Sequence, residues 1–181
     1  DATTGSYDGG LLSVAASGDV TLAGGSYLHG EYLTIATNGG ISLAGGSEVG
    51  AYQDTSLVAN GVAGIGLNGS YAHSDNASVV LQAPAGPVQM TGADLWAEGN
   101  LAISAGAAVT MSATDIESGG ILSIFATGPV SLSSGSWLHG EFLNLISGGA
   151  VSAVSGSEMG AYQDAEVSAA GNISFTGSGI H

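Results

Sequence analysis

The fold is decided by residues 99–132, which read GNLAISAGAAVTMSATDIESGGILSIFATGPVSL. Apolar residues alternate with small or polar ones at 101–103 and 109–111, and the same alternation returns about 21 residues later at 122–124 and 130–132. A period of two residues is typical of β-strands and not of helices. The stretch therefore predicts short strands that recur at a fixed spacing along the chain.

The same pattern extends over nearly the whole chain of 181 residues. Each repeat contains a V-x-L-like pair, a second alternating strip about eight residues before it, and one apolar anchor after it. The V-x-L-like pairs start at Val20, Ile41, Val62, Val88, Val109, Val130, Val151 and Ile173. The second strips begin at Leu12, Leu33, Leu101, Leu122 and Leu143, and the single anchors are Leu28, Val49, Leu95, Ile116, Leu138 and Met159.

A strip of three or four residues cannot bury its apolar face alone, but stacked copies of it can. Gly-Gly pairs such as 24–25, 39–40 and 45–46 mark corners that need a positive φ or a close backbone approach. Connections between parallel strands are right-handed in nearly all proteins. We therefore predict an all-β fold, a right-handed parallel β-helix (β-solenoid) of about 21 residues per coil. Roughly eight coils stacked about 4.8 Å apart would make a rod roughly 40 Å long.

A longer repeat is superimposed on the coils. Residues 11–51 match residues 121–161 without a gap, at an offset of 110 residues. This offset corresponds to five coils, one of which we expect to be enlarged by five residues near 68–78. We interpret residues 1–181 as a single solenoid segment, an uncapped fragment of a longer repeat array.

The composition excludes several classes of partner. The chain has no Lys or Arg, fifteen Asp and Glu, and a formal net charge of −15. Nucleic acids and anionic membrane surfaces are bound through cationic side chains, so neither is expected as a partner. No run of eighteen apolar residues occurs, so we expect no membrane insertion. A hydrophobic share of 44% also argues against a disordered acidic tail.

Residues 99–132 and AAGNISFTGS at 169–178 resemble filamentous haemagglutinin-type repeats, which read roughly G-x-L-x-L-x-A-x-G-x-V-x-L. Such repeats occur in bacterial two-partner-secreted adhesins and in contact-dependent toxin-delivery exoproteins. The resemblance covers nearly the whole chain. It implies a right-handed β-helix, secretion to the bacterial cell surface, and a role in adhesion or display.

All four histidines close the same GSxxH motif, and an acidic residue follows three of them. The motif alternates along the chain with GSEVGAYQD at 46–54 and GSEMGAYQD at 156–164. This spacing predicts one edge of the rod that is rich in acidic, histidine and aromatic side chains. The candidate residues of this binding or packing edge are Tyr27, His29, Glu31, Tyr32, Glu48, Tyr52, Asp54, Tyr71, His73, Asp75, Trp137, His139, Glu141, Phe142, Glu158, Tyr162 and Asp164.

Three interpretations of this edge stay open. It is the widest corner of the coil, where large polar residues fit; it packs laterally against a neighbouring rod; or its aromatic and carboxylate groups bind sugars. The register also makes His29 a neighbour of Glu48, and Asp54 a neighbour of Asp75, on adjacent coils. We expect no cofactor beyond loosely bound Ca²⁺, because the chain lacks the linear HxH and HExxH spacings of zinc sites. A specific metal site is left open.

Catalysis is not expected. Lyase chemistry on this fold needs a Lys or Arg, and the acids recur with the coil instead of forming one unique pair. A glycoside hydrolase, which needs only two carboxylates across a groove, is a remote alternative. The sequence thus predicts an extracellular structural or adhesive fibre or adhesin stalk. Its expected partners are copies of itself, in lateral or head-to-tail filaments, or glycans of a host or cell surface.

Overall fold

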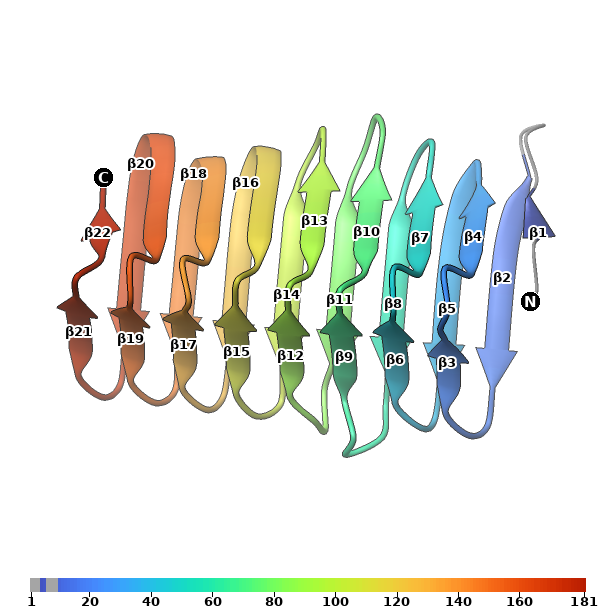
Figure 1. Cartoon of the computed structure of the whole chain (residues 1–181), viewed down its shortest axis with the longest axis horizontal. Helices are drawn as coiled ribbons and strands as arrows, with labels where there is room; N and C mark the ends of the chain where they lie inside the picture. Colours follow the sequence, from blue (N-terminus) through green and yellow to red (C-terminus); the bar gives the residue numbers. More distant parts are fainter. Residues whose placement is uncertain (1–3, 6–9) are drawn as a thin grey trace.

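The computed structural model describes residues 4–5 and 10–181 and shows a parallel β-solenoid of about eight turns. Figure 1 shows the coils side by side along the long axis, with the N-terminal coil at the right and the C-terminal coil at the left. The described residues contain only strands, turns and bends. The all-β class and the repeat of about 21 residues are therefore confirmed. The expectation that residues 1–3 and 6–9 belong to the same solenoid lies outside the described residues.

Each coil contributes strands to three faces of the rod. Face 1 is formed by β1 (Thr4–Gly5), β4 (Tyr27–Gly30), β7 (Glu48–Ala51), β10 (Tyr71–Ser74), β13 (Asp94–Ala97), the first parts of β16 (Asp115–Ala126), β18 (Trp137–Ser147) and β20 (Glu158–Ala169), and β22 (Gly179–Ile180). Face 2 is formed by β2 (Leu11–Ala16), β5 (Tyr32–Thr37), β8 (Thr55–Ala59), β11 (Val79–Ala83), β14 (Leu101–Ala105) and the second parts of β16, β18 and β20. Face 3 is formed by β3 (Val20–Leu22), β6 (Ile41–Ala44), β9 (Ile65–Asn68), β12 (Val88–Thr91), β15 (Val109–Ser112), β17 (Val130–Ser133), β19 (Val151–Val154) and β21 (Ile173–Thr176).

Faces 1 and 2 form one sheet because the three long strands β16, β18 and β20 turn the corner between them. The turn is made at irregularities, where the pairing of β16 with β18 shifts after Ser118 and that of β18 with β20 shifts after Gly140. Bulges of this kind bend a strand and re-aim its side chains. In the earlier coils the same corner is an open turn, so that face 1 and face 2 strands are separate.

The core consists of columns of identical or similar apolar side chains. On face 2, Ile35 pairs with Leu57, and Leu101 pairs with Leu122, which pairs with Leu143. The single anchors also stack, as predicted. In order along face 1 they are Leu28, Val49, Leu95, Ile116, Leu138 and Met159, and Ala72, which was not predicted, fills the place between Val49 and Leu95. Because each inward residue rests on its copy one coil away, burial is nearly complete through the middle of the rod.

One predicted start of a V-x-L-like pair is wrong. Val62 is 82% exposed, and Ile65 takes its place between Ile41 and Val88. Residues 60–64 form a longer corner, in which Gly64 has a φ of +70°. This corner absorbs extra residues and delays the start of the strand. The enlargement near 68–78 is correspondingly more spread out, since the longer corners include residues 60–64, 75–78 and 84–87.

The corner that precedes face 1 has a left-handed backbone at two successive positions in four coils and at one position in the coils of Gly69, Gly92, Ala113 and Gly177. Gly24 and Gly25 have φ values of +66° and +76°. In two later coils a serine takes the first position, as at Ser134 with φ of +57° before Gly135. Glycine adopts this conformation without a steric penalty, which explains the recurrent GGS and SGS segments. No helix long and apolar enough to cross a membrane occurs in the part of the chain that the structure describes.

Candidate functional site

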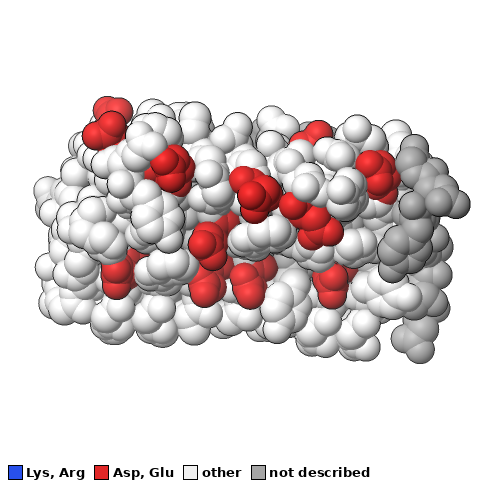
Figure 2. Space-filling view, turned by 90° about the horizontal axis from the view of Figure 1, so that it is seen from above, with Lys and Arg blue, Asp and Glu red and all other residues white. Residues whose placement is uncertain are grey.

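The predicted edge residues all lie on face 1 or at the corner between faces 1 and 2. Figure 2 shows Asp and Glu side chains gathered along the side of the rod seen from above. The structure does not bring these residues into one site. They form two groups separated along the rod by β13 and β16, one on or beside β4, β7 and β10 and one on β18 and β20.

Two neighbouring columns of outward side chains organise both groups. The first column runs Tyr27, Glu48, Tyr71, Asp94, Asp115, Trp137, Glu158 and Gly179. The second column lies two residues further along each strand. Its members are His29, Gly50, His73, Trp96, Glu117, His139 and Gly160, and the ring of His181 reaches Gly160 from the next coil.

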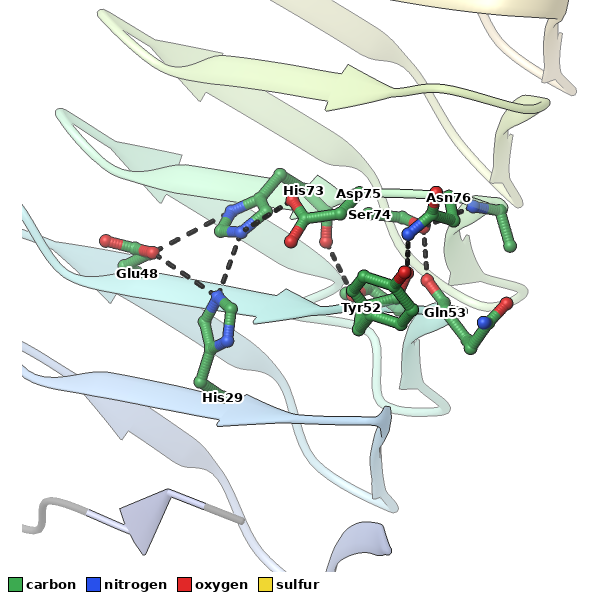
Figure 3. A network of polar contacts seen from close by, with 10 residues as sticks. His29, Glu48, Tyr52, Gln53, His73, Ser74, Asp75 and Asn76 are labelled. Carbon is green, nitrogen blue, oxygen red and sulfur yellow. Dashed lines mark hydrogen bonds and ion pairs between the residues drawn. The ribbon is translucent and has the colours of Figure 1, made fainter. Parts of the chain in front are cut away.

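His29, Glu48 and His73, here called the first histidine cluster, come from three successive coils (Figure 3). The Nε2 atoms of His29 and His73 are 2.9 Å apart, a hydrogen bond in which one ring donates N–H and the other accepts. Glu48 Oε1 lies 3.7 Å from His29 Nε2 and 3.8 Å from His73 Nδ1. On the opposite side, Asp75 Oδ1 is 3.7 Å from His73 Nε2. The expected proximity of His29 and Glu48 is confirmed.

Gly50 makes the contact between the two histidines geometrically feasible. It occupies the same column on the coil between them, and a Cβ atom there would lie 2.5 Å from His73 Nε2 and 2.7 Å from His29 Nε2. The two rings therefore meet over the backbone of an intervening residue that has no side chain. Any other residue at position 50 would keep them apart.

The surroundings favour neutral imidazole at His73. Desolvation by burial lowers the pKa of His73 below its ordinary value of 6.5, and the nearby His29 ring lowers it further. The carboxylates of Asp75, Glu48 and Asp94 oppose this shift. The side chains of His29 and His73 remain 23% and 21% exposed, so solvent reaches both rings.

His139, Glu158 and His181 form a second histidine cluster 110 residues further along the chain. The Nε2 atoms of His139 and His181 are 3.3 Å apart, with Gly160 between the two rings. Glu158 Oε1 is 3.2 Å from His181 Nδ1. His139 itself is buried, because Trp137 stacks on its ring at a centroid distance of 4.8 Å and Tyr162 meets it edge-on at 4.5 Å. Its Nδ1 is buried without a hydrogen-bond partner among the described residues.

The segment between the clusters carries uncompensated acids. Asp94 and Asp115 pair directly across β13 and β16. Burial raises the pKa of Asp115, and repulsion from Asp94 and Glu117 raises it further. Like charges directly opposite one another on neighbouring strands destabilise a sheet.

The remaining edge residues have local partners or face solvent. Asp54 accepts a hydrogen bond from the backbone N–H of Ser78 on the next coil. Gln163 donates to Glu141. The exposed aromatic side chains of this edge are Tyr27, Tyr32, Tyr52, Tyr71, Phe142 and Tyr162.

Sequence reasoning placed the histidines at one corner but did not find that they pair. The sequence signal for this pairing is the last glycine of GSEVG and of GSEMG. This glycine falls in the histidine column on the coil between two GSxxH coils. It becomes visible only when the register is written out for three coils at once. The stacking of Trp137 on His139 was also missed, although the two residues lie two positions apart on one strand and therefore share a face.

No family model, no curated protein and no solved structure matches the chain. The fold and the side-chain geometry therefore carry the functional argument.

Proposed function

We propose that the chain is a stretch of extracellular rod with a structural or adhesive role at a bacterial cell surface, and that it catalyses no reaction. The observation that carries this proposal is the unbroken parallel pairing of all three faces, from β2, β3 and β4 to β20 and β21. A fold that only repeats provides length, stiffness and a recurrent surface. The finer assignment, to filamentous haemagglutinin-type stalks, rests on the resemblance of the repeats together with this solenoid architecture.

Immunogold electron microscopy of intact cells that make the protein tests this role. Gold label on surface filaments, lost together with those filaments when the gene is deleted, is the expected result. Label confined to the cell interior would contradict an extracellular rod. Intact surface filaments in the deletion strain would contradict the structural role.

Lateral association is part of the proposal. The exposed tyrosines and Phe142 along the corner of faces 1 and 2 offer contact area, while the net charge of −15 opposes close approach of two rods. Millimolar Ca²⁺ should therefore promote bundling by screening and bridging the carboxylates. Electron microscopy of the native material at neutral pH, with and without Ca²⁺, should show bundles only with the cation, and identical images would contradict this step.

A second candidate function, sugar binding, is favoured by one specific observation. Tyr27, Glu48 and Tyr71 stand next to one another on face 1, and the two tyrosine residues are 42% and 49% exposed. Exposed aromatic rings on either side of a carboxylate can stack on a sugar and hydrogen-bond to its hydroxyl groups. On a glycan array, the double variant Tyr27→Ala/Tyr71→Ala should lose binding, while Tyr162→Ala should retain it. Unchanged binding by the double variant would remove this candidate.

A further inference from the structure

The first histidine cluster gathers three metal-ligating side chains at one point on face 1. One donor atom each from His29, Glu48 and His73 lies within 4.8 Å of the other two. The three residues are far apart in sequence and belong to β4, β7 and β10. We propose that this cluster binds one divalent transition-metal ion of the zinc class and thereby ties three successive coils together.

The donor spacing fits such an ion. A tetrahedral zinc centre has bonds of about 2.0–2.1 Å to imidazole nitrogen or carboxylate oxygen, so its ligand atoms are about 3.4 Å from one another. In the first histidine cluster the corresponding separations are 2.9 Å between the two Nε2 atoms and 3.7 Å from His29 Nε2 to Glu48 Oε1. These two values lie on either side of the ideal distance, and Glu48 Oε1 approaches the ring of His73 from its Nδ1 side, at 3.8 Å. The rings must be neutral to bind a metal.

Asp75 lies beside the cluster but outside the three converging donors. Its Oδ1 lies 3.7 Å from His73 Nε2, on the side opposite Glu48 in Figure 3. Two imidazole nitrogens and one carboxylate oxygen form a donor set that suits Zn²⁺, Cu²⁺ or Ni²⁺, whereas Ca²⁺ prefers oxygen donors alone. The cluster is thus chemically distinct from the acids elsewhere on the rod, which attract cations of any kind.

Gly50 acts as a positioning residue for the metal ligands. A side chain there would collide with both rings, as described above, so its absence is required for the two nitrogens to converge. The chain repeats the arrangement, with Gly160 between His139 and His181. A zinc site assembled in this way has no linear sequence motif, because each ligand comes from a different coil.

The proposal is tested by isothermal titration calorimetry, in which Zn²⁺ is added to the whole chain in millimolar Ca²⁺. Excess Ca²⁺ occupies the loose carboxylate sites, so that heat reports only selective binding. We expect one Zn²⁺ site, weakened on the order of 100-fold or more in His29→Gln/His73→Gln, because even loss of an outer partner of a metal ligand costs about 10–100-fold. Absence of Zn²⁺ binding that survives Ca²⁺, or equal binding by the double variant, would overturn the proposal.

Two further variants distinguish the site from a general effect. His139→Gln/His181→Gln removes the same number of histidines and should leave the affinity within about threefold, whereas a loss equal to that of the first double variant would refute the assignment to the first cluster. Gly50→Ala keeps every donor but separates the rings, and should weaken Zn²⁺ on the order of 10-fold; unchanged affinity would refute the ring geometry. A metal-free β-type circular dichroism spectrum shared by all variants establishes that they fold. Cu²⁺ adds a spectroscopic readout, because a bound Cu²⁺ ion should show magnetic coupling to two imidazole nitrogens in the natural chain. Either single histidine variant of the first cluster should show coupling to fewer nitrogens.

Discussion

The two histidine clusters occupy equivalent positions in the 110-residue repeat but differ in what surrounds them. His29 and His73 are similarly accessible, with 23% and 21% of each side chain exposed. In the second cluster, His139 is only 5% exposed, whereas the side chain of His181 is 55% exposed. The burial of His139 arises from Trp137, which stands in place of Tyr27 on face 1 and stacks on the imidazole ring.

This comparison shows how a repeat fold diversifies without changing its backbone. Trp137 and Tyr162 enclose the imidazole of His139, and its Nδ1 has no hydrogen-bond partner in the described part of the chain. A histidine that binds a metal normally donates its second N–H to a partner. The second cluster is therefore organised mainly by aromatic packing and the first by polar contacts. Four predictions test this contrast, from the largest expected effect to the smallest.

The largest effect concerns the apolar anchors beneath the two clusters. Leu138 is completely buried under the second cluster, while its counterpart Leu28 is 8% exposed near the N-terminal end of the rod. Leu138→Ala should lower the free energy of unfolding by about 3 kcal/mol and Leu28→Ala by about 2 kcal/mol, since the cost grows with the cavity that cannot collapse. Chemical denaturation of both variants measures this, and an equal or larger loss at Leu28 would contradict the difference in packing.

The second prediction concerns the aromatic residue that distinguishes the clusters. Trp137→Ala removes a stacked ring and should cost about 2 kcal/mol, whereas Tyr27→Ala should cost no more than about 0.5 kcal/mol because that ring is largely in solvent. Thermal unfolding gives both values. In NMR spectra the ring protons of His139 should shift strongly in the tryptophan variant, while those of His29 should barely move in the tyrosine variant. Equal costs would mean that Trp137 does not define the second cluster.

Particular residues show how far the sequence could predict this structure. The columns of Leu101, Leu122 and Leu143 follow from alternation and spacing alone, because a slip of one residue would expose them. Val62 misled the register because it fits the 21-residue spacing, while the longer corner at 60–64 places Ile65 inside instead. Corner length depends on backbone conformation and is not encoded in hydrophobic periodicity.

The pairing of the histidines could not be predicted from the sequence, for a related reason. Predicting it requires the exact register of three coils and the recognition that Gly50 leaves a gap which His29 and His73 fill from both sides. Pairwise neighbours such as His29 and Glu48 are accessible from the repeat spacing. Contacts between residues two coils apart are not, because side chains normally fill that space.

The third prediction concerns the two glycines. A Cβ atom at Gly160 would lie 2.8 Å from His139 Nε2, and His139 is held in place by Trp137. Gly160→Ala should therefore cost about 1 kcal/mol, as overpacking does. At Gly50 the two rings are freer to swing towards solvent, so Gly50→Ala should cost no more than about 0.5 kcal/mol in the absence of metal. Thermal unfolding without metal measures both, and a larger cost at Gly50 would indicate that the first cluster is the more rigid one.

The smallest effect lies between the clusters, where Asp94 and Asp115 are paired. The pKa of Asp115 is raised in the folded chain above its ordinary value of 3.8, so ionisation of this carboxyl opposes folding at neutral pH. Asp115→Asn should therefore stabilise the rod at pH 7, by only a few tenths of a kcal/mol because the carboxyl is largely exposed and screened. The gain should fade as the pH falls through the raised pKa and vanish below 3.8, where the natural carboxyl is protonated in both states. Asp94→Asn should give a smaller gain, because it removes the repulsion but leaves Asp115 buried, and the double variant should gain little more than Asp115→Asn alone. Unfolding curves at pH 3 and pH 7 measure these differences. A gain that persists at pH 3, or gains that add fully, would show that repulsion between the two carboxylates is not its cause.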